Sequence, residues 1–86
     1  MSTNEDQFLK SLRATFAVEA NEHLEAIAAG LVALEKPITP DEQQPLVETV
    51  FRAAHSLKGA ARAVNLVEVE SVCQVLEDVF AAWKRR

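Results

Sequence analysis

The sequence predicts an all-α fold, an antiparallel up-and-down bundle of three long helices. Hydrophobic residues make up 49% of the 86 residues, and Ala, Val and Leu occur 14, 10 and 9 times. Two glycines and three prolines leave too little turn chemistry for a many-stranded sheet. Three segments carry apolar residues at steps of three and four, which is the spacing of amphipathic helices. The links between these segments are short enough to join only adjacent helices.

The first helix is expected from about residue 5 to residue 35. One apolar stripe runs along the whole segment, and Pro37 closes it because the proline ring cannot continue a helix. The stripe consists of Phe8, Leu12, Phe16, Ala20, Leu24, Ile27, Leu31 and Leu34.

The second helix is expected from about residue 41 to 64 and the third from about 66 to 84. Pro40 or Asp41 can open the second helix, and Pro45 could also sit in its first turn, which leaves the start open by several residues. Asn65 tolerates the left-handed conformation that ends helices, so it is the expected C-cap. The two stripes read Val47, Val50, Phe51, Ala54, Leu57, Ala61, Val64 and Val69, Val72, Cys73, Leu76, Val79, Phe80, Trp83.

Such a small bundle would gain from a fourth helix. Burial of three stripes falls short of the conformational entropy that ordering the chain costs. We expect the missing helix to come from a longer parent chain or from a second copy, as a homodimer that completes the bundle. An exposed stripe carrying Phe80 and Trp83 would be the docking surface.

Composition excludes several classes of protein. Thirteen acidic against nine basic residues give a net charge of -4, the wrong sign for gripping nucleic acid. The lone Cys73 permits no internal disulfide and no cysteine-rich metal site. No apolar run approaches the ~18 residues of a membrane span, and the acidic N-terminus lacks the core of a signal peptide. We therefore expect one cytoplasmic domain over residues 1–86, without membrane or nucleic-acid partners.

A histidine, a lysine and a glycine meet in the middle of the second helix. His55 and Gly59 lie one turn apart on a face that flanks the apolar stripe, and Lys58 lies one turn beyond His55, at the other margin of the stripe toward solvent. Glycine inside a helix costs about 1 kcal/mol relative to alanine, which this chain uses freely. Gly59 therefore indicates cleared space in which a large partner can approach His55.

The hairpin gives His55 an acidic partner. His55 lies ten residues before Asn65 and Glu77 twelve after it, so both lie roughly 15–18 Å from the turn at ~1.5 Å per residue. A carboxylate that accepts the Nδ1 proton leaves Nε2 with a free, outward lone pair. The expected chemistry is attack on phosphorus to give a phosphohistidine, with Lys58, and Arg52 or Arg62, meeting the phosphoryl charge.

The run Phe-Arg-Ala-Ala-His-x-x-Lys-Gly at 51–59 resembles the histidine phosphotransfer (HPt) domains. It is most similar to the N-terminal phosphoacceptor domain of chemotaxis-type histidine kinases, the CheA family. The resemblance implies that His55 takes a phosphoryl group from the ATP-binding domain of a kinase. His55 would then pass it to an aspartate of a response-regulator receiver of the CheY or CheB kind. ATP and Mg²⁺ would enter only through these partner domains, and no cofactor or metal would be bound.

The resemblance also assigns roles to single residues. Lys58 matches the lysine near the phosphate, Gly59 the small clearance residue and Glu77 the glutamate bonded to the ring. Departures bear on which receiver is preferred: Gln74 stands where some chemotaxis kinases have a second histidine, and Ala60, Arg62 and Asn65 replace glycine or small residues. The expected receiver or phosphate contacts are Gly59, Arg52, Ser56 and Arg62.

Other interpretations stay open beside the phosphocarrier. The same face could bind a partner without chemistry, as a helical adaptor does, and loss of His55 would then leave signalling intact. An autonomous enzyme has little support because the chain has no P-loop and no glycine-rich nucleotide loop. His23 with Glu19 one turn away could hint at a metal but is better explained as a surface histidine, and Cys73 as a core residue.

Overall fold

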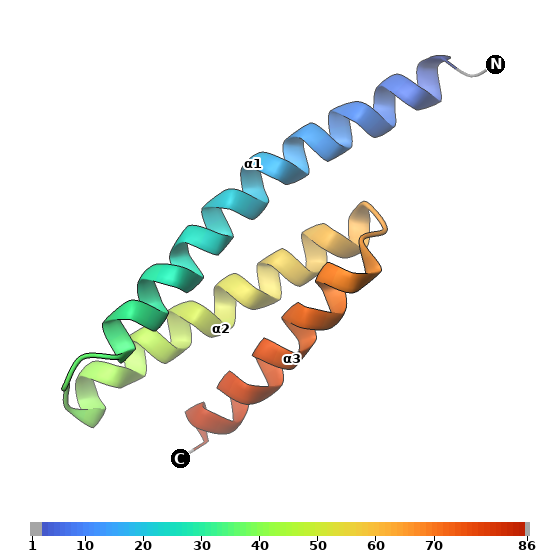
Figure 1. The fold of residues 1–86 in the computed structure, drawn as a ribbon. Coiled ribbons are helices and arrows are strands. Elements are labelled where there is room, and N and C mark those ends of the chain that lie inside the picture. Colours follow the sequence, from blue (N-terminus) through green and yellow to red (C-terminus); the bar gives the residue numbers. More distant parts are fainter. Residues whose placement is uncertain (1–2, 86) are drawn as a thin grey trace.

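The computed structural model describes residues 3–85, which form three α-helices joined by short links (Figure 1). The helices are α1 (Thr3–Leu34), α2 (Pro40–Ala63) and α3 (Val67–Lys84). Each begins and ends within two residues of the expected bounds, and the described residues contain no strand. The all-α class is confirmed, whereas expectations for residues 1–2 and 86 lie outside the described part. Within residues 3–85, none of the helices combines the length and hydropathy that crossing a bilayer requires.

A capping box starts α2 at Pro40. The backbone N–H of Glu42 donates to Thr39 Oγ1 at 3.2 Å, and the backbone N–H of Thr39 donates to Glu42 Oε1 at 3.4 Å. Pro40 occupies the first helical position, where its missing N–H costs nothing. Residues 39–42, Thr-Pro-Asp-Glu, have the sequence pattern of a capping box, which could have located the start of α2.

The turn between α2 and α3 is a Schellman motif centred on Asn65. Asn65 has a φ of 61°, in the left-handed region. The backbone N–H of Leu66 donates to the carbonyl of Ala61 at 2.9 Å, and that of Asn65 donates to the carbonyl of Arg62 at 3.2 Å. The left-handed conformation predicted for Asn65 is therefore confirmed, although the C-cap of α2 is Val64 and Asn65 is the residue after it.

The core lies around α2, which packs against both other helices. No Cα atom of α1 comes within 8 Å of a Cα atom of α3. The bundle is therefore open between α1 and α3, and we call this side of the fold the open corner. The buried apolar residues are Ala20 and Ile27 from α1, Val47, Val50, Ala53, Ala54, Leu57 and Ala61 from α2, and Cys73 and Phe80 from α3.

The apolar stripe of α1 is only partly covered. The N-terminal part of α1 projects past the turn between α2 and α3 (Figure 1), and Phe8 is 64% exposed. Leu24 and Leu31 are also exposed, although they belong to the stripe that buries Ile27. A helix stripe can be wider than the neighbour that covers it, so α1 keeps apolar residues on its surface.

The prediction that Phe80 belongs to an exposed docking surface on α3 is wrong. Phe80 is 4% exposed and belongs to the core, seven residues and about two turns after the buried Cys73. Trp83 is half-buried and packs beside it, with 5.5 Å between the ring centroids. The exposed valines of α3 lie on another side of the helix and are Val67, Val72, Val75 and Val79.

The two glycines lie in opposite environments. A Cβ atom at Gly30 would overlap the Val50 side chain, which is fully buried, so α1 and α2 approach closely at this point. A Cβ atom at Gly59 would meet no atom within 4 Å. Gly30 therefore serves packing between the helices, a role that the sequence analysis did not assign, whereas nothing inside the fold requires Gly59.

We expect opposite effects of alanine at the two glycines on the free energy of unfolding, measured by urea denaturation. Gly30→Ala gains about 1 kcal/mol of helix propensity but overpacks Val50, so it should lower that free energy by about 1–2 kcal/mol net. Gly59→Ala makes no clash and should raise it by up to about 1 kcal/mol. A stabilised Gly30→Ala protein would contradict the close approach of α1 and α2.

Candidate functional site

His55 and Glu77 face each other across the α2–α3 hairpin. The Asn65 turn makes the helices antiparallel and leaves the two residues at nearly the same level. His55 Nδ1 lies 2.6 Å from Glu77 Oε1. The His55 side chain is 66% exposed, whereas Glu77 is 8% exposed as a residue. The structure thus brings together the pair that the residue count from the turn predicts.

The carboxylate of Glu77 is shared by two donors. Lys58 Nζ donates to Glu77 Oε2 at 2.8 Å, while His55 takes the other oxygen. Burial alone raises the pKa of Glu77, but the hydrogen bonds from Lys58 and His55 outweigh it and hold the pKa below its ordinary value of 4.5. Glu77 is therefore ionised at neutral pH.

An ionised Glu77 determines the tautomer of His55. A carboxylate can only accept hydrogen bonds, so Nδ1 of the ring must carry the proton that joins them. In the neutral ring Nε2 then has no proton and keeps its lone pair. Because the side chain is largely exposed, the imidazole offers a nucleophilic nitrogen at the molecular surface.

Lys58 has a second tether that the sequence analysis missed. Lys58 Nζ donates to Gln74 Oε1 at 3.1 Å, and Gln74 Nε2 donates to Asp78 Oδ1 at 2.9 Å. Gln74 holds the lysine beside Glu77 and is itself oriented by Asp78. Lys58 lies seven residues before Asn65 and Gln74 nine after it, so the count that located Glu77 could also have located Gln74.

The arginines expected near the phosphate are paired with acids in the structure. Arg52 Nε lies 2.7 Å from Glu48 Oε1, one turn earlier on α2. Arg62 Nε lies 3.9 Å from Glu70 Oε2 on α3. Neither ion pair includes His55, Lys58, Glu77 or Gln74, so Arg52 and Arg62 stand outside the cluster that these four residues form. The remaining expected contacts, Ser56 and Gly59, are both exposed.

Gly59 leaves the surface next to the imidazole open. It lies one turn after His55 on α2, and the space where its side chain would stand is empty to 4 Å. A bulky group can therefore approach Nε2 over bare helix backbone. With a lysine held within reach, this arrangement suits transfer of an anionic group to the ring nitrogen.

Cys73 and His23 make no hydrogen bond or ion pair with the cluster of His55, Lys58, Glu77 and Gln74. Cys73 is buried in the core, as expected, and burial raises the pKa of its thiol. His23 is half-buried on α1. Among residues 3–85, no group of three or more His, Cys, Asp or Glu side chains is arranged to hold a metal ion.

The tautomer of His55 can be read by ¹⁵N NMR. We expect the neutral ring to show a protonated Nδ1 and an unprotonated Nε2, because ionised Glu77 accepts from Nδ1. Glu77→Ala removes this acceptor and should shift the ring toward a mixture of tautomers. Glu70→Ala on the same helix is the matched control and should leave the ring unchanged. A protonated Nε2 in the wild type would contradict the assignment.

The lowered pKa of Glu77 also predicts a pH dependence of stability. A carboxylate with a depressed pKa stabilises the fold above its unfolded pKa, and this contribution is lost as the pH falls through the folded value. The difference in free energy of unfolding between wild type and Glu77→Gln should therefore be full at neutral pH and shrink below about pH 4.5. Glu68→Gln, at an exposed acid of α3 outside the cluster, serves as the control. A difference that stays constant in urea titrations at pH 7 and pH 3 would argue against it.

Comparison with known proteins assigns the family. The Hpt domain family model matches residues 11–86. The chemotaxis protein CheA of Listeria monocytogenes is 36% identical over 64 residues, which are 74% of this chain and 10% of that protein. CheA of Bacillus subtilis is 37% identical over 67 residues, 78% of this chain and 10% of that protein.

The chain thus spans about a tenth of the length of the curated relatives it matches. No solved structure matches it. The similarity that residues 51–59 indicate is confirmed by the match over most of the sequence. The chain belongs to the Hpt domain family, the histidine phosphotransfer domains of two-component systems.

Proposed function

We propose that His55 carries a phosphoryl group from the ATP-binding domain of a histidine kinase to an aspartate of a response-regulator receiver. One observation carries the proposal: an exposed imidazole is bonded through Nδ1 to a buried, ionised glutamate. This bond leaves Nε2 as the reacting atom. The other residues of the site, Lys58, Gln74 and Gly59, stabilise charge or provide room.

In the first step, the Nε2 lone pair attacks the γ-phosphorus of ATP held by the kinase domain. The N–P bond forms while the bond between phosphorus and the bridging oxygen breaks, and ADP leaves with that electron pair. The ring keeps its Nδ1 proton and becomes cationic. Glu77, at 2.6 Å, stabilises this charge as it develops.

Lys58 is suited to hold the transferred group. Its ammonium has three N–H donors, and the described contacts use two of them, on Glu77 and Gln74. The third can donate to a phosphoryl oxygen without breaking either bond. Lys58 therefore adds a fixed positive charge beside the phosphohistidine.

In the second step, a carboxylate oxygen of the receiver aspartate attacks the phosphorus and the N–P bond breaks. The electron pair returns to Nε2, so the ring becomes neutral again with its Nδ1 proton in place. The chain gains and loses no proton over the cycle. Nucleotide and magnesium chemistry belong to the kinase and the receiver, so this domain needs only to present the nitrogen.

The partners follow from the open surface around His55. A receiver must bring its aspartate to Nε2, and the bare backbone at Gly59 gives it room. The exposed side chains of Arg52, Ser56 and Arg62 surround the approach. Since the curated relatives are chemotaxis proteins, we propose receivers of the CheY or CheB kind and a chemotaxis-type kinase domain.

The test is phosphorylation by a cognate kinase domain with radiolabelled ATP. The wild type should acquire an acid-labile, alkali-stable label, and His55→Gln should not. His23→Gln, the same substitution on α1, is the control and should be labelled normally. Glu77→Ala should be labelled about ten to a hundred times more slowly while staying folded, because a charge-assisted hydrogen bond contributes about 1.5–3 kcal/mol.

Two outcomes would contradict the phosphocarrier: an unlabelled wild type or a labelled His55→Gln variant. Equal rates for Glu77→Ala and wild type would reject the role of Glu77 in orienting the imidazole. If His55→Ala also left signalling intact, the chain would act as a helical adaptor that binds its partner without phosphotransfer.

A further inference from the structure

Two basic residues flank His55 on α2 at equal spacing. Arg52 lies three residues before His55 and Lys58 three residues after it. With 3.6 residues per turn, the two cations stand about 60° to either side of the imidazole when the helix is viewed along its axis. Residues at this spacing have Cβ atoms about 5–6 Å apart, which is within the reach of long side chains. A phosphoryl group on Nε2 would therefore lie between two basic side chains.

The contact that holds Arg52 in the structure is easily exchanged. Arg52 Nε lies 2.7 Å from Glu48 Oε1, and the arginine side chain is 77% exposed. An exposed ion pair contributes little, because water solvates both charges when they separate. Lys84 Nζ lies 2.8 Å from Oε2 of the same carboxylate. The hydrogen bond from Lys84, followed by the one from Arg52, holds the pKa of Glu48 below its ordinary value of 4.5. Glu48 thus keeps its main cation if Arg52 leaves.

Phosphorylation of His55 would place a stronger acceptor on the other side of Arg52. A phosphoryl group carries more than one negative charge at neutral pH and has three acceptor oxygens. Glu48 carries a single charge, which it shares with Lys84. The planar guanidinium matches phosphate oxygens with two parallel N–H donors. Since Glu48 lies four residues before Arg52 and His55 three after it, the guanidinium must turn from one to the other to make this contact.

Arg62 is less suited to the same role. It lies seven residues after His55, which is about 10 Å along the helix at ~1.5 Å per residue. Side chains of a helix lean toward its N-terminus, so the imidazole leans toward the level of Arg52 and away from Arg62. Arg62 is 80% exposed and pairs with Glu70 at 3.9 Å. The two arginines are therefore alike in exposure and pairing but differ in their distance from the imidazole.

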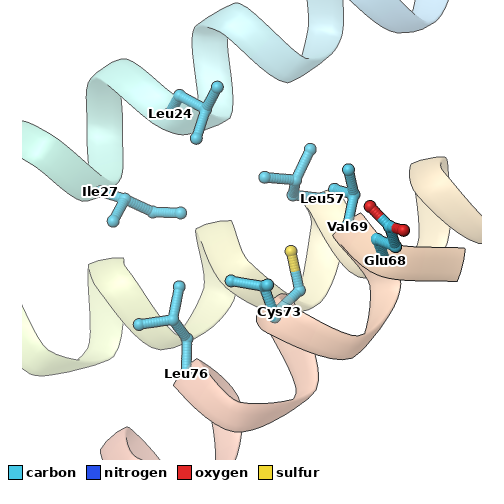
Figure 2. Close-up of a pocket in the computed structure, with 8 residues that line it drawn as sticks. Leu24, Ile27, Leu57, Glu68, Val69, Cys73 and Leu76 are labelled. Atoms are coloured by element: carbon cyan, nitrogen blue, oxygen red, sulfur yellow. The ribbon is translucent and has the colours of Figure 1, made fainter. Parts of the chain in front are cut away.

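The phosphoryl site lies on the side of α2 that faces away from the apolar groove at the open corner. Figure 2 shows Leu57 of α2 among the residues that line this groove, with Leu24 of α1 and Cys73 of α3. His55 lies about 200° and Arg52 about 140° around α2 from Leu57. A group that covered the groove would therefore leave His55 and Arg52 accessible.

We propose that Arg52 leaves Glu48 and binds the phosphoryl group when His55 is phosphorylated, while Lys84 stays on Glu48. The inference rests on the proposed function, because it requires a phosphoryl group on His55. Lys58 and Arg52 then hold the phosphoryl oxygens from two sides, and each offsets part of their charge. Before phosphorylation, Glu48 keeps the guanidinium within one turn of the imidazole.

The first test follows the phosphoryl group by ³¹P NMR and needs no kinase. Phosphoramidate is the donor: the Nε2 lone pair attacks its phosphorus, the N–P bond of the donor breaks and ammonia leaves. Every protein tested carries His23→Gln, so that His55 is the sole histidine of the chain. The measured quantity is the apparent pKa of the phosphoryl group, read from the pH dependence of the ³¹P shift. A cation in contact with the group lowers this pKa.

Arg52→Gln removes one cation and should raise the apparent pKa of the phosphoryl group by about 0.2–0.7, the range of an exposed ion pair. Arg62→Gln is the matched control and should change it by less than half as much. Lys58, Glu77 and the ring of His55, which are the other charged groups at the site, are the same in both variants. The difference between the variants therefore reports the arginine alone.

The second test observes the exchange itself in ¹H–¹⁵N spectra. The Nε–H signal of Arg52 should shift when His55 is phosphorylated, because its acceptor changes from a carboxylate to a phosphoryl oxygen, whereas that of Arg62 should not. Equal phosphoryl pKa effects of the two arginine substitutions, or an Arg52 signal that ignores phosphorylation, would overturn the inference. Normal labelling by the kinase beside such a result would leave the phosphocarrier standing. Labelling by phosphoramidate but not by the kinase would reject the phosphocarrier and leave the Arg52 result intact.

Discussion

The buried carboxylate of Glu77 couples the register of the α2–α3 hairpin to the geometry of the site. Removing a charge from water is costly, and the cost is met only if hydrogen bonds replace the lost hydration. Both replacements come from α2: His55 takes one oxygen at 2.6 Å and Lys58 the other at 2.8 Å. If α3 slid by one turn, the carboxylate would lose both partners. The ionised glutamate therefore fixes the register of the hairpin while it orients the imidazole.

The hairpin is held at both ends around this pair. At one end the Asn65 turn satisfies the last carbonyls of α2. At the other end Lys84 of α3 lies 2.8 Å from Glu48 and its ammonium stands 4.3 Å from the centre of the Phe51 ring. Because the reacting groups stand on two regular helices fixed in this way, their geometry does not depend on a mobile loop.

The two sides of α2 carry different tasks. One side, with Val47, Val50 and Leu57, is buried or faces the open corner of the bundle. The other side bears His55 and the bare backbone at Gly59. In the proposed function, partner domains supply the nucleotide and magnesium chemistry. The carrier therefore needs an accessible Nε2 on His55 more than an enclosed pocket. The exposed imidazole with a buried orienting acid meets that need.

Periodicity and spacing were enough to predict the helices, their bounds within two residues, the Asn65 turn and the pairing of His55 with Glu77. These features depend on periodicity, local capping and the constant rise of a helix, all of which can be counted along the chain. Counting could also have located the Thr39 capping box and the level of Gln74.

Which apolar faces are covered depends on how the helices pack in three dimensions. Periodicity shows that a face is apolar, but it does not show whether a neighbour is present there. Phe80 therefore proved to be core, while Leu24 and Leu31 proved to be exposed. Linear spacing also does not predict the close approach of α1 to α2 at Gly30. Nor does it predict that Lys58 binds Glu77 and Gln74, whereas Arg52 and Arg62 pair with other acids. Helix separation and the reach of long side chains are set by three-dimensional packing, because several arrangements satisfy the same linear spacing.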